Sequence, residues 1–445
     1  MQAPGPSTLS FLAGVRGRGF LDTVGELWRA HGDVSQVRIG KRRLLFAMHP
    51  DAVKQVNVTN RQRYDKRASY DNVRDHLTGQ GLVASTGDVW RRQRRLMAPF
   101  FTTQGVTEYA DIMIEDGLRF VDRWQGLAQR GEEVEIGEEM TQITASIILK
   151  AMFSTETISG MGHMRESIAT MISWVTHRLA GVPWPLWVPT PGNRRFLAAQ
   201  SSVYGAIEGL IAARRATPPE QWPDDLLSRL MRVRDEETGA PMSDTLLRDE
   251  CITIFVAGHE TTARTMTFAW YALAANPEVA ERLHAELDAV LGGRTPTLAD
   301  LKQLPYTLRV VKEILRMYPP APFYSRDAVE ADMIGEVEIP VGAAVMLSPY
   351  FTHRHPDFWP DAERFDPDRW TPEREAAQHG FAWHPFAAGQ RICLGNHFSL
   401  LETHLLLAIL GQRFSPRLRP GYTARWEMQG VLSLADGLPM TIAAR

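Results

Sequence analysis

One cysteine of this sequence stands in a setting that suits a metal ligand. Cys393 lies in the stretch FAAGQRICLG and is followed at once by an apolar segment with helical spacing. Backbone N–H groups and the dipole at a helix N-terminus stabilise a thiolate, which is the form of cysteine that binds metal ions. A lone cysteine is more often a buried structural residue, so the residues around Cys393 must decide between the two interpretations.

Four neighbours of this cysteine have properties that suit a cofactor site. Phe386 can shield the sulfur, and Arg391 can pair with a carboxylate of a ligand. Gly389 and Gly395 permit tight turns and a close approach of the backbone. The pattern Phe-x-x-Gly-x-Arg-x-Cys-x-Gly therefore favours a thiolate ligand over a structural cysteine.

A second group of polar residues interrupts an apolar segment that has helical spacing. The stretch CITIFVAGHETTARTMTF is apolar on nearly all sides but contains the run Gly258 to Thr262. An interior glycine and buried polar groups each cost a helix stability, so a purely structural helix rarely combines them. We expect a ligand to lie against this segment.

The loop around Cys393 resembles the haem-binding loop of the cytochrome P-450 family, and the resemblance covers roughly residues 20 to 440. It implies haem b (iron protoporphyrin IX) as the cofactor, with Cys393 as the axial ligand of the iron. It also implies that Phe386, Gly389, Arg391 and Gly395 surround the haem.

The polar run of the long apolar segment is similar to the oxygen-binding segment of the same family. The resemblance implies that Ala257 and Gly258 leave room beside the haem. It also implies that Thr261 donates a hydrogen bond to dioxygen and that Glu260 relays protons from solvent. Taken alone, the run also fits threonines bonded back to the helix and a satisfied core pair of His259 and Glu260. His259 is one residue from Gly258 and should face elsewhere.

Three further residues match the family's partners of the haem propionates. Trp90 and Arg94 have the spacing Trp-x-x-x-Arg, which is one helical turn and aims both side chains at one carboxylate. Arg326 is expected as the third. A solvated basic helix is the alternative, and for Arg91, Arg92 and Arg95 we prefer that alternative or a docking patch for an acidic electron donor.

An acid and a base stand three residues apart in another segment with helical spacing. Glu313 and Arg316 would by themselves be an ordinary surface pair. In the family this Glu-x-x-Arg is buried and is joined by an arginine from a later meander. The resemblance implies Arg364 as that arginine, although Ala362 stands where the family more often has proline.

The elements that must position these residues are mostly helices. The spacing of apolar residues predicts helices over 109–130, 138–153, 163–179, 194–215, 277–291, 304–317 and 397–412. Ser243 is a plausible N-cap of a longer helix that ends before Pro277 and spans about 50 Å. The pattern of residues 34–48 predicts a hairpin around Gly40-Lys41. Apolar and polar residues alternate over residues 333–347, which predicts strands there.

These elements predict a mainly α fold of the cytochrome P-450 type in one domain over residues 1–445. A β-rich part lies at approximately residues 20–60 and 320–350, and the helical bulk at approximately residues 65–320 and 380–415. The family layout implies a roomy apolar pocket shaped by residues 69–82, 180–192 and 322–325. Trp184 and Trp187 in the second segment either guard an entrance, touch a membrane surface or pack within the loop.

Composition excludes several classes of protein. With 445 residues, 44% of them hydrophobic and 23% charged, the chain has the composition of a globular protein rather than a disordered one or a coiled coil. A net charge of −3 leaves no basic field for nucleic acid. Two distant cysteines indicate a reducing, cytoplasmic compartment, with Cys251 in the core. The N-terminal apolar stretch is too short to be a transmembrane anchor.

The resemblance implies a haem-thiolate monooxygenase that hydroxylates or epoxidises a hydrophobic small molecule such as a fatty acid, terpenoid or steroid. Electrons are expected from separate proteins, a ferredoxin and its reductase or an equivalent donor, because no Gly-x-Gly-x-x-Gly follows a predicted strand. Two alternatives stay open: a peroxygenase of the same fold, and a haem-thiolate sensor or carrier without catalysis. Substrate identity lies beyond the sequence.

Overall fold

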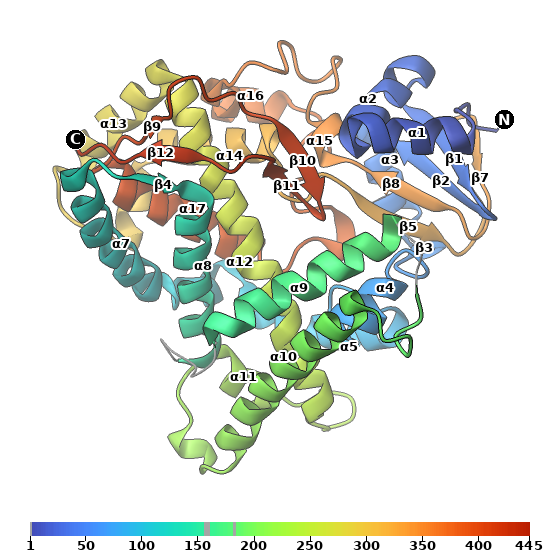
Figure 1. The fold of residues 1–445 in the computed structure, drawn as a ribbon, viewed down its shortest axis with the longest axis horizontal. Coiled ribbons are helices and arrows are strands. Elements are labelled where there is room, and N and C mark those ends of the chain that lie inside the picture. The colour runs from blue at the N-terminus through green and yellow to red at the C-terminus, as the bar shows by residue number, and fades with distance from the viewer. Residues whose placement is uncertain (1, 155–160, 181–183) are drawn as a thin grey trace. The chain divides into compact units, whose positions relative to one another are not determined.

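The computed structural model of the chain describes residues 2–154, 161–180 and 184–445. These residues form two compact units, each described by itself below. The first unit comprises residues 1–69, 113–143 and 261–445, and the second comprises residues 70–112 and 144–260. Three helices have residues in both units (Figure 1): α7 (Ala110–Arg130), α8 (Ile136–Phe153) and α12 (Asp244–Ala275).

The strands of the described residues all belong to the first unit. A five-stranded sheet has the order β1-β2-β8-β5-β3, in which β2 and β8 are parallel and the other neighbours are antiparallel. Its strands are β1 (Val34–Ile39), β2 (Arg42–Ala47), β3 (Tyr64–Asp65), β5 (Tyr324–Ala328) and β8 (Ala344–Leu347). The smaller sheets contain β4 (Glu133–Glu135), β6 (Asp332–Ile334), β7 (Val337–Ile339), β9 (Arg417–Leu418), β10 (Trp426–Gln429), β11 (Val431–Leu434) and β12 (Pro439–Thr441).

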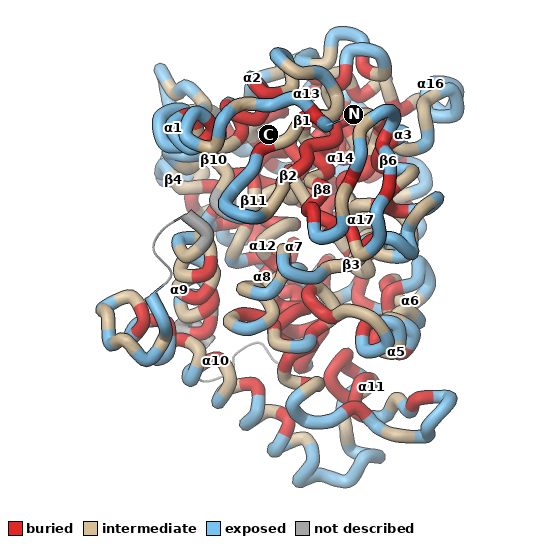
Figure 2. Tube along the Cα trace, turned by 90° about the vertical axis from the view of Figure 1, so that its right-hand side faces the viewer, coloured by how far each residue is buried: buried red, intermediate tan, exposed pale blue. Residues whose placement is uncertain are grey.

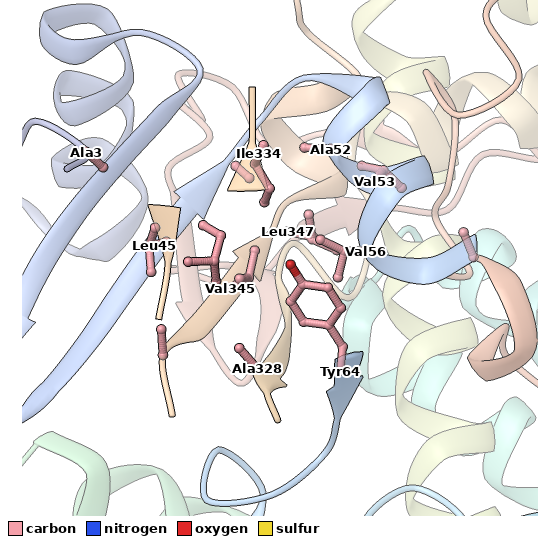
Figure 3. Packing of buried hydrophobic residues seen from close by; sticks show 14 residues of the cluster. Ala3, Leu45, Ala52, Val53, Val56, Tyr64, Ala328, Ile334, Val345 and Leu347 are labelled. Carbon is pink, nitrogen blue, oxygen red and sulfur yellow. The ribbon is translucent and has the colours of Figure 1, made fainter. Parts of the chain in front are cut away.

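A hydrophobic cluster packs on the five-stranded sheet (Figure 3). Leu45, Val345 and Leu347 of the sheet are fully buried against Val53 and Val56. Val53 lies in α3 (Pro50–Lys54), and Val56 lies in the short π-helix η1 (Gln55–Thr59) that follows it. Side chains alternate between the two faces of a strand, so residues at every second position can share one buried face. The cluster fixes η1 beside the sheet and, as shown below, η1 supports the Cys393 loop.

The helices of the first unit are α1 (Thr8–Arg18), α2 (Phe20–His31), α3 (Pro50–Lys54), α13 (Pro277–Leu291), α14 (Pro305–Met317), α15 (Pro349–Thr352), α16 (Pro372–Ala377) and α17 (Asn396–Gly411). Among them, α1 and α2 contact β1 of the sheet, and α13, α14 and α17 contact one another. Most residues of α14 and α17 are buried (Figure 2). The two helices that carry Glu313 and follow Cys393 are therefore core elements.

The second unit is mostly helical. Its helices are α4 (Asp71–Val73), α5 (Gly87–Met97), α6 (Thr103–Thr107), α9 (Met161–Ala180), α10 (Pro191–Arg215) and α11 (Leu226–Arg232), together with the parts of α7, α8 and α12 that belong to this unit. The helix α10 is long and apolar enough to cross a membrane by length and composition alone. Its buried residues recur every three or four positions, which is the pattern of an amphipathic helix. The helix packs on α9, and Phe196 of α10 stacks on Trp174 of α9.

The predicted elements agree with the structure at most positions. The mainly α fold class is confirmed, and the seven predicted helices occur with ends shifted by a few residues. Ser243 Oγ accepts a hydrogen bond from Leu246 N at 3.2 Å, so it caps α12 as predicted, and that helix is 32 residues long. The short strands β4 and β9 to β12 were not predicted, because two to four residues carry little periodicity.

Candidate functional site

The Cys393 loop is a tight backbone turn that ends at the N-terminus of α17. Ile392 N donates to Gly389 O at 3.0 Å, and Cys393 N donates to Phe386 O at 2.8 Å. These bonds fold the loop back on itself, and the cysteine is exposed three residues before α17 begins. The helix N-terminus provides partial positive charge, which favours the thiolate form of Cys393.

The two glycines of the loop differ in why the protein needs them. Gly389 has a φ of +67°, and a Cβ there would lie 2.0 Å from the carbonyl oxygen of Asn57 in η1. A side chain at this position is therefore excluded both by backbone conformation and by space. A Cβ on Gly395 would meet no described protein atom within 4 Å. Packing within the protein does not account for Gly395, and its cofactor role remains a prediction.

Two predicted propionate partners and one lysine lie near the cysteine in the first unit. Arg391 forms an ion pair with Asp65 at 2.5 Å, and Arg326 on β5 is buried. Sequence analysis did not identify Lys66, which follows β3 directly. Asp65 pairs with Asp327 in the antiparallel β3–β5 register, so Lys66 is next to Arg326 across the sheet.

The charges of this cluster act on one another. Part of the Lys66 residue reaches the surface, but dense packing around its ammonium group and the positive charges of Arg326 and Arg391 lower its pKa well below the ordinary value. The negative charges of Cys393 and Asp65 oppose that shift. An added group with two carboxylates would relieve the repulsion among the three cations.

The donor set of the first unit therefore fits a haem. A cysteine sulfur at a helix N-terminus suits the iron, and the cluster of Lys66, Arg326 and Arg391, of which Arg326 is buried, suits the two propionates of the porphyrin. The signal for Lys66 is not a motif of adjacent residues. It depends on a β3–β5 pairing between segments that are far apart in the sequence.

The middle of α12 presents the residues expected to handle oxygen. Ala257 is exposed, and Gly258, Glu260 and Thr261 are half-buried. In the second unit, a Cβ on Gly258 would lie 3.1 Å from the Cδ1 atom of Ile148 on α8. A larger residue at position 258 would therefore press on the Ile148 side chain, in addition to affecting the role predicted for Gly258.

His259 points away from the residues on either side of it, as expected from its position in the helix. It is buried, its Nδ1 lies 2.7 Å from Phe255 O, and Thr144 Oγ1 donates to its backbone carbonyl at 2.9 Å. These contacts support a structural role for the ring. Cys251 lies one turn before Phe255 and is buried as predicted, and burial raises the pKa of its thiol.

Trp90 and Arg94 both lie on α5 in the second unit, one turn apart, with Trp90 buried and Arg94 half-buried. The solvated basic face or docking patch expected for Arg91, Arg92 and Arg95 stays a prediction: Arg91 and Arg95 are exposed, and Arg92 is half-buried. Arg92 and Arg95 each bind the buried carboxylate of Asp235 at 3.1 Å. Asp235 is buried, so it fixes the position of the two arginines, whose side chains stay 38% and 39% exposed.

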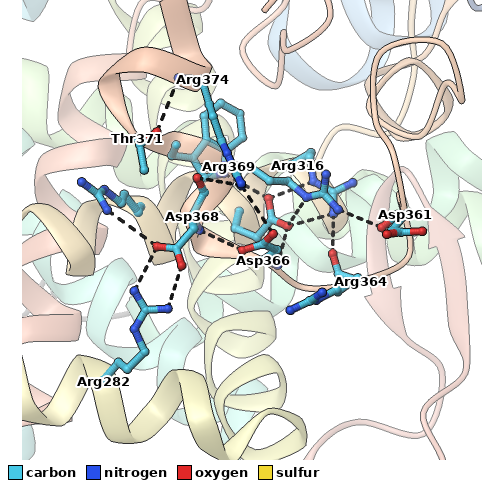
Figure 4. A network of polar contacts seen from close by, with 12 residues as sticks. Arg282, Arg316, Asp361, Arg364, Asp366, Asp368, Arg369, Thr371 and Arg374 are labelled. Atoms are coloured by element: carbon cyan, nitrogen blue, oxygen red, sulfur yellow. Dashed lines mark hydrogen bonds and ion pairs between the residues drawn. The ribbon is translucent and has the colours of Figure 1, made fainter.

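A buried ion-pair network centres on α14 (Figure 4). Glu313 and Arg316 have no exposed surface and form two hydrogen bonds of 2.8 and 2.9 Å. Arg316 also donates to the backbone carbonyls of His353 and Arg364, at 3.0 and 3.2 Å. Glu313 accepts from Trp370 Nε1 at 3.0 Å. The predicted burial of the Glu-x-x-Arg pair is confirmed.

The third arginine of this network is Arg369, not Arg364 as predicted. Arg369 Nε lies 3.4 Å from Glu313 Oε1, whereas Arg364 is exposed and contributes only its carbonyl (Figure 4). The sequence Pro367-Asp368-Arg369-Trp370 supplies the proline and the aromatic residue around the arginine. The apparent departure at Ala362 therefore came from aligning the wrong arginine.

One group of side chains outside these sites has metal-ligand chemistry. Ligand atoms of Asp33, His49 and His355 lie within 4.8 Å of one another. However, the Nδ1 atoms of both histidines accept from backbone amides, of Asp51 at 3.1 Å and of Asp357 at 3.3 Å. A neutral ring with that acceptor carries its proton on Nε2 and offers no lone pair to a metal. His355 instead donates to Asp33 at 3.1 Å, and this bond lowers the pKa of Asp33.

The segments expected to shape the pocket are described in part. Within 69–82, Gln80 N and Leu82 N donate to Asp249 and Glu250 of α12. Residues 181–183 of the second segment lie outside the described residues. Trp184 and Trp187 are 56% and 82% exposed, so packing within the loop does not cover them.

Comparison with known proteins gives a consistent result. The cytochrome P-450 family model matches residues 3–436. The chain is 36% identical to cyclooctatin synthase of Streptomyces melanosporofaciens, over 92% of this chain and 88% of that protein. It is 35% identical to cyclooctat-9-en-7-ol 5-monooxygenase of the same organism, over 88% and 84%. It is 32% identical to pentalenene oxygenase of Streptomyces avermitilis, over 94% of both.

A solved structure agrees over the whole chain. The crystal structure of a cytochrome P-450 haem domain matches with a TM-score of 0.91 and 27% sequence identity. The match covers 100% of this chain and 98% of that one.

Proposed function

The chain belongs to the cytochrome P-450 family of haem-dependent monooxygenases, and from that premise we propose that it oxidises a cyclic terpenoid. The family acts by inserting one atom of dioxygen into a hydrophobic substrate. The names of three relatives, which include an unsaturated cyclic alcohol and pentalenene, support a cyclic and unsaturated hydrocarbon skeleton over a fatty acid or a steroid. We expect hydroxylation or epoxidation of that skeleton.

The observation that carries the proposal is the exposed Cys393 near a cluster of three cations, Lys66, Arg326 and Arg391. The group that fits there is haem b, which supplies, when bound, an iron centre that activates dioxygen. Cys393 holds the iron as a thiolate, while Arg391, Arg326 and Lys66 pair with the propionates. Trp90 and Arg94 of α5 are proposed to bind a propionate as well, and Phe386 and Gly395 to border the porphyrin near the cysteine.

The α12 residues handle dioxygen and protons. Ala257 and Gly258 would leave room for the cofactor and dioxygen, because neither has more than a methyl side chain. Thr261 donates a hydrogen bond through its hydroxyl towards dioxygen, and Glu260 takes up a proton from solvent and delivers it to that position. Replacing Glu260 with glutamine is expected to slow turnover roughly 10²-fold.

Electrons come from a separate protein in this proposal, a ferredoxin with its reductase or an equivalent donor. The family generally needs redox partners, a substrate and dioxygen. The docking surface is not assigned to α5, since Arg92 and Arg95 are engaged with Asp235. We place the reaction in the cytoplasm, which agrees with two free cysteines.

The test is product formed per electron consumed, with dioxygen and a surrogate ferredoxin pair. The substrate is chosen first by a Soret-shift screen of cyclic terpenes, linear fatty acids and steroids. Thr261→Ala should keep haem and substrate binding but divert electrons into hydrogen peroxide. Thr267→Ala is the matched control, because that hydroxyl lies on the same helix and is bonded back to Ala263 O at 2.8 Å.

The outcomes separate the alternatives. Equal coupling in Thr261→Ala and the parent protein would contradict the role of α12. A peroxygenase would turn over with hydrogen peroxide and lose little from either the Thr261 or the Glu260 variant. A haem-thiolate sensor would bind ligands without turnover. A Soret shift with fatty acids but with none of the cyclic terpenes would overturn the substrate class.

A further inference from the structure

A tyrosine at the start of β5 lies between two parts of the haem site. Tyr324 is half-buried and belongs to residues 322–325, one of the segments expected to shape the pocket. Its hydroxyl lies among residues that support the Cys393 loop. Asn57 Nδ2 donates to this hydroxyl at 3.2 Å, and the hydroxyl lies 3.5 Å from Nδ1 of His384, which comes just before the loop. Tyr324 therefore has contacts that a pocket residue would not need.

The hydrogen bonds around this hydroxyl run in one direction. Asn57 Nδ2 also donates to the carbonyl oxygen of Val53 at 2.9 Å, which identifies the atom as the amide nitrogen. A hydroxyl that accepts a bond from Asn57 keeps its own proton for another acceptor. Nδ1 of His384 can be that acceptor, because burial lowers the pKa of this histidine to about 3 and leaves its ring neutral. Protons are therefore donated from Asn57 to Tyr324 and from Tyr324 to His384.

The ring of His384 makes its only hydrogen bond with a described residue to Tyr324. His384 is 3% exposed, and its Nε2 has no partner among the described residues. The backbone of His384 is held separately: its N donates to His353 Nε2 at 2.8 Å, and its O accepts from Ala387 N in the Cys393 loop at 3.0 Å. Removing the tyrosine hydroxyl would leave a buried ring without a partner, which costs more than the loss of an exposed hydrogen bond.

The ring of Tyr324 contacts the other part of the haem site. Tyr324 and Arg326 are two positions apart on β5, so their side chains share one face of the sheet. The guanidinium carbon of Arg326 lies 4.9 Å from the centre of the tyrosine ring, within the range of a cation–π contact. Arg326 also donates to Ser325 O at 2.8 Å, and among the described residues no carboxylate pairs with it. The tyrosine ring is therefore the main side-chain contact that holds this buried charge in place.

We propose that Tyr324 is a positioning residue for the haem. Its ring holds Arg326 ready for a propionate, and its hydroxyl holds His384 and with it the start of the Cys393 loop. One side chain thereby couples the thiolate end of the site to a propionate partner. The proposal rests on the haem site proposed above, and it gives Tyr324 no contact with dioxygen or substrate.

The test separates the hydroxyl from the ring in the haem-loaded protein. Tyr324→Phe removes the hydroxyl and keeps the ring beside Arg326, whereas Tyr324→Leu removes both. His384→Phe removes the imidazole and keeps the backbone bond of that residue. Tyr306→Leu is the matched control: Tyr306 on α14 is 7% exposed, the guanidinium carbon of Arg282 lies 4.3 Å from its ring centre, and its hydroxyl bonds no described residue.

The first readout is the carbon monoxide spectrum of the reduced protein, followed over time. Weaker support of the loop should convert the red-shifted Soret band of thiolate ligation to a band at shorter wavelength. We expect this conversion to be roughly tenfold faster in Tyr324→Phe than in the parent, because the change leaves a buried polar partner unsatisfied. His384→Phe should also convert faster. Combining the two changes should give a rate no higher than that of the faster single variant, because both remove the same bond.

The second readout is haem transfer to an excess of an apo-globin acceptor. Tyr324→Leu should lose haem roughly fivefold faster than Tyr324→Phe, because only the leucine variant loses the cation–π contact with Arg326. If Tyr324→Leu gives no haem-loaded protein, Tyr324→Met provides the same comparison. Tyr306→Leu should keep the parent's conversion and transfer rates even where its melting temperature falls, which separates positioning from a general loss of stability.

Each part of the proposal can be contradicted by itself. Parent-like band conversion in Tyr324→Phe would overturn the role of the hydroxyl, and equal haem transfer from Tyr324→Phe and Tyr324→Leu would overturn that of the ring. A double variant that converts faster than both single variants would show that Tyr324 does not act through His384. Equal effects in Tyr306→Leu would reduce the result to lost stability and overturn the proposal. Absence of the red-shifted band from the haem-loaded parent would instead contradict the haem site itself.

Discussion

At the scale of single residues, the site depends on where charge is placed. Lys66, Arg326 and Arg391 crowd together near Cys393, although like charges in a buried place raise the free energy of the folded chain. Such a cluster is retained where a ligand with opposite charge compensates it. We therefore expect Lys66 to help hold the haem in the protein.

Replacing Lys66 with methionine should speed the loss of haem, because it removes one charge-assisted bond worth about 1.5–3 kcal/mol, or roughly tenfold or more in rate. The measurement is haem transfer from the purified protein to an excess of an apo-globin acceptor. Lys54→Met is the control, since Lys54 is an exposed lysine at the end of α3. Equal transfer rates in the two variants and the parent would exclude Lys66 from the propionate site.

Single residues were predicted well where one local pattern contains all the signals. The Cys393 loop could be identified from ten consecutive residues, and in the structure its backbone turn contains a hydrogen bond from Cys393 N to Phe386 O. The sequence analysis named Arg364 and did not consider Arg369, although Arg364-Phe365 and Arg369-Trp370 are similar patterns that lie close together. Only the fold brings Arg369, and not Arg364, to Glu313.

At the scale of elements, the meander after α15 is bound to α14 by this ion-pair network (Figure 4). Removing one member of a buried charged network leaves its partners unpaired, at a cost of about 3 to 5 kcal/mol. Arg316→Ala should therefore give little haem-loaded protein and a lower melting temperature. Arg364→Ala should behave like the parent, because Arg316 uses only the carbonyl of Arg364. Comparable losses in the two variants would contradict the assignment.

The first half of α12 contains the buried acid Glu250, which accepts a hydrogen bond from Leu82 N at 3.1 Å. Burial raises the pKa of Glu250 from its ordinary value of 4.5 to about 8, and the charge of Asp249 adds to the shift. A raised pKa means that the folded state binds the proton more tightly than the unfolded state. The stability that this group contributes is complete below about pH 4.5 and is lost as the pH rises to about 8.

Glu250→Gln should flatten the pH dependence of stability in that window, where one proton accounts for at most about 1.4 kcal/mol per pH unit. Above pH 8 the variant should be more stable than the parent, because glutamine keeps the acceptor for Leu82 N without the charge. Melting temperatures across this pH range provide the measurement, with Glu281→Gln as the exposed control. Parallel curves for Glu250→Gln and the parent would show that Glu250 is ionised throughout.

The helices were predictable because three or more turns repeat the same apolar spacing, as in α7 and α12. The five-stranded sheet was predicted only in part. The β1–β2 hairpin has a local turn at Gly40, whereas β3 has two residues and pairs with a strand more than 250 positions later. Such long-range pairings leave no local pattern, and the position of Lys66 depends on one of them.

At the scale of the whole molecule, the fold and family are shown by agreement over nearly the full chain. The sequence predicted both, since the motifs of the family are dense after residue 250. The expectation of one domain over residues 1–445 stays a prediction beside the two compact units of the structure. Substrate shape depends on side chains from segments that are far apart, and for that reason no local motif encodes it.

The central claim is that Cys393 binds haem iron as a thiolate, and one spectrum tests it most directly. Carbon monoxide added to the reduced, haem-loaded protein should give the red-shifted Soret band of thiolate ligation. Cys393→His should abolish that band, and Cys251→Ala should keep it, because Cys251 is buried in the core with a raised thiol pKa. The account is contradicted by the same red-shifted band in Cys393→His, or by its absence from the haem-loaded parent.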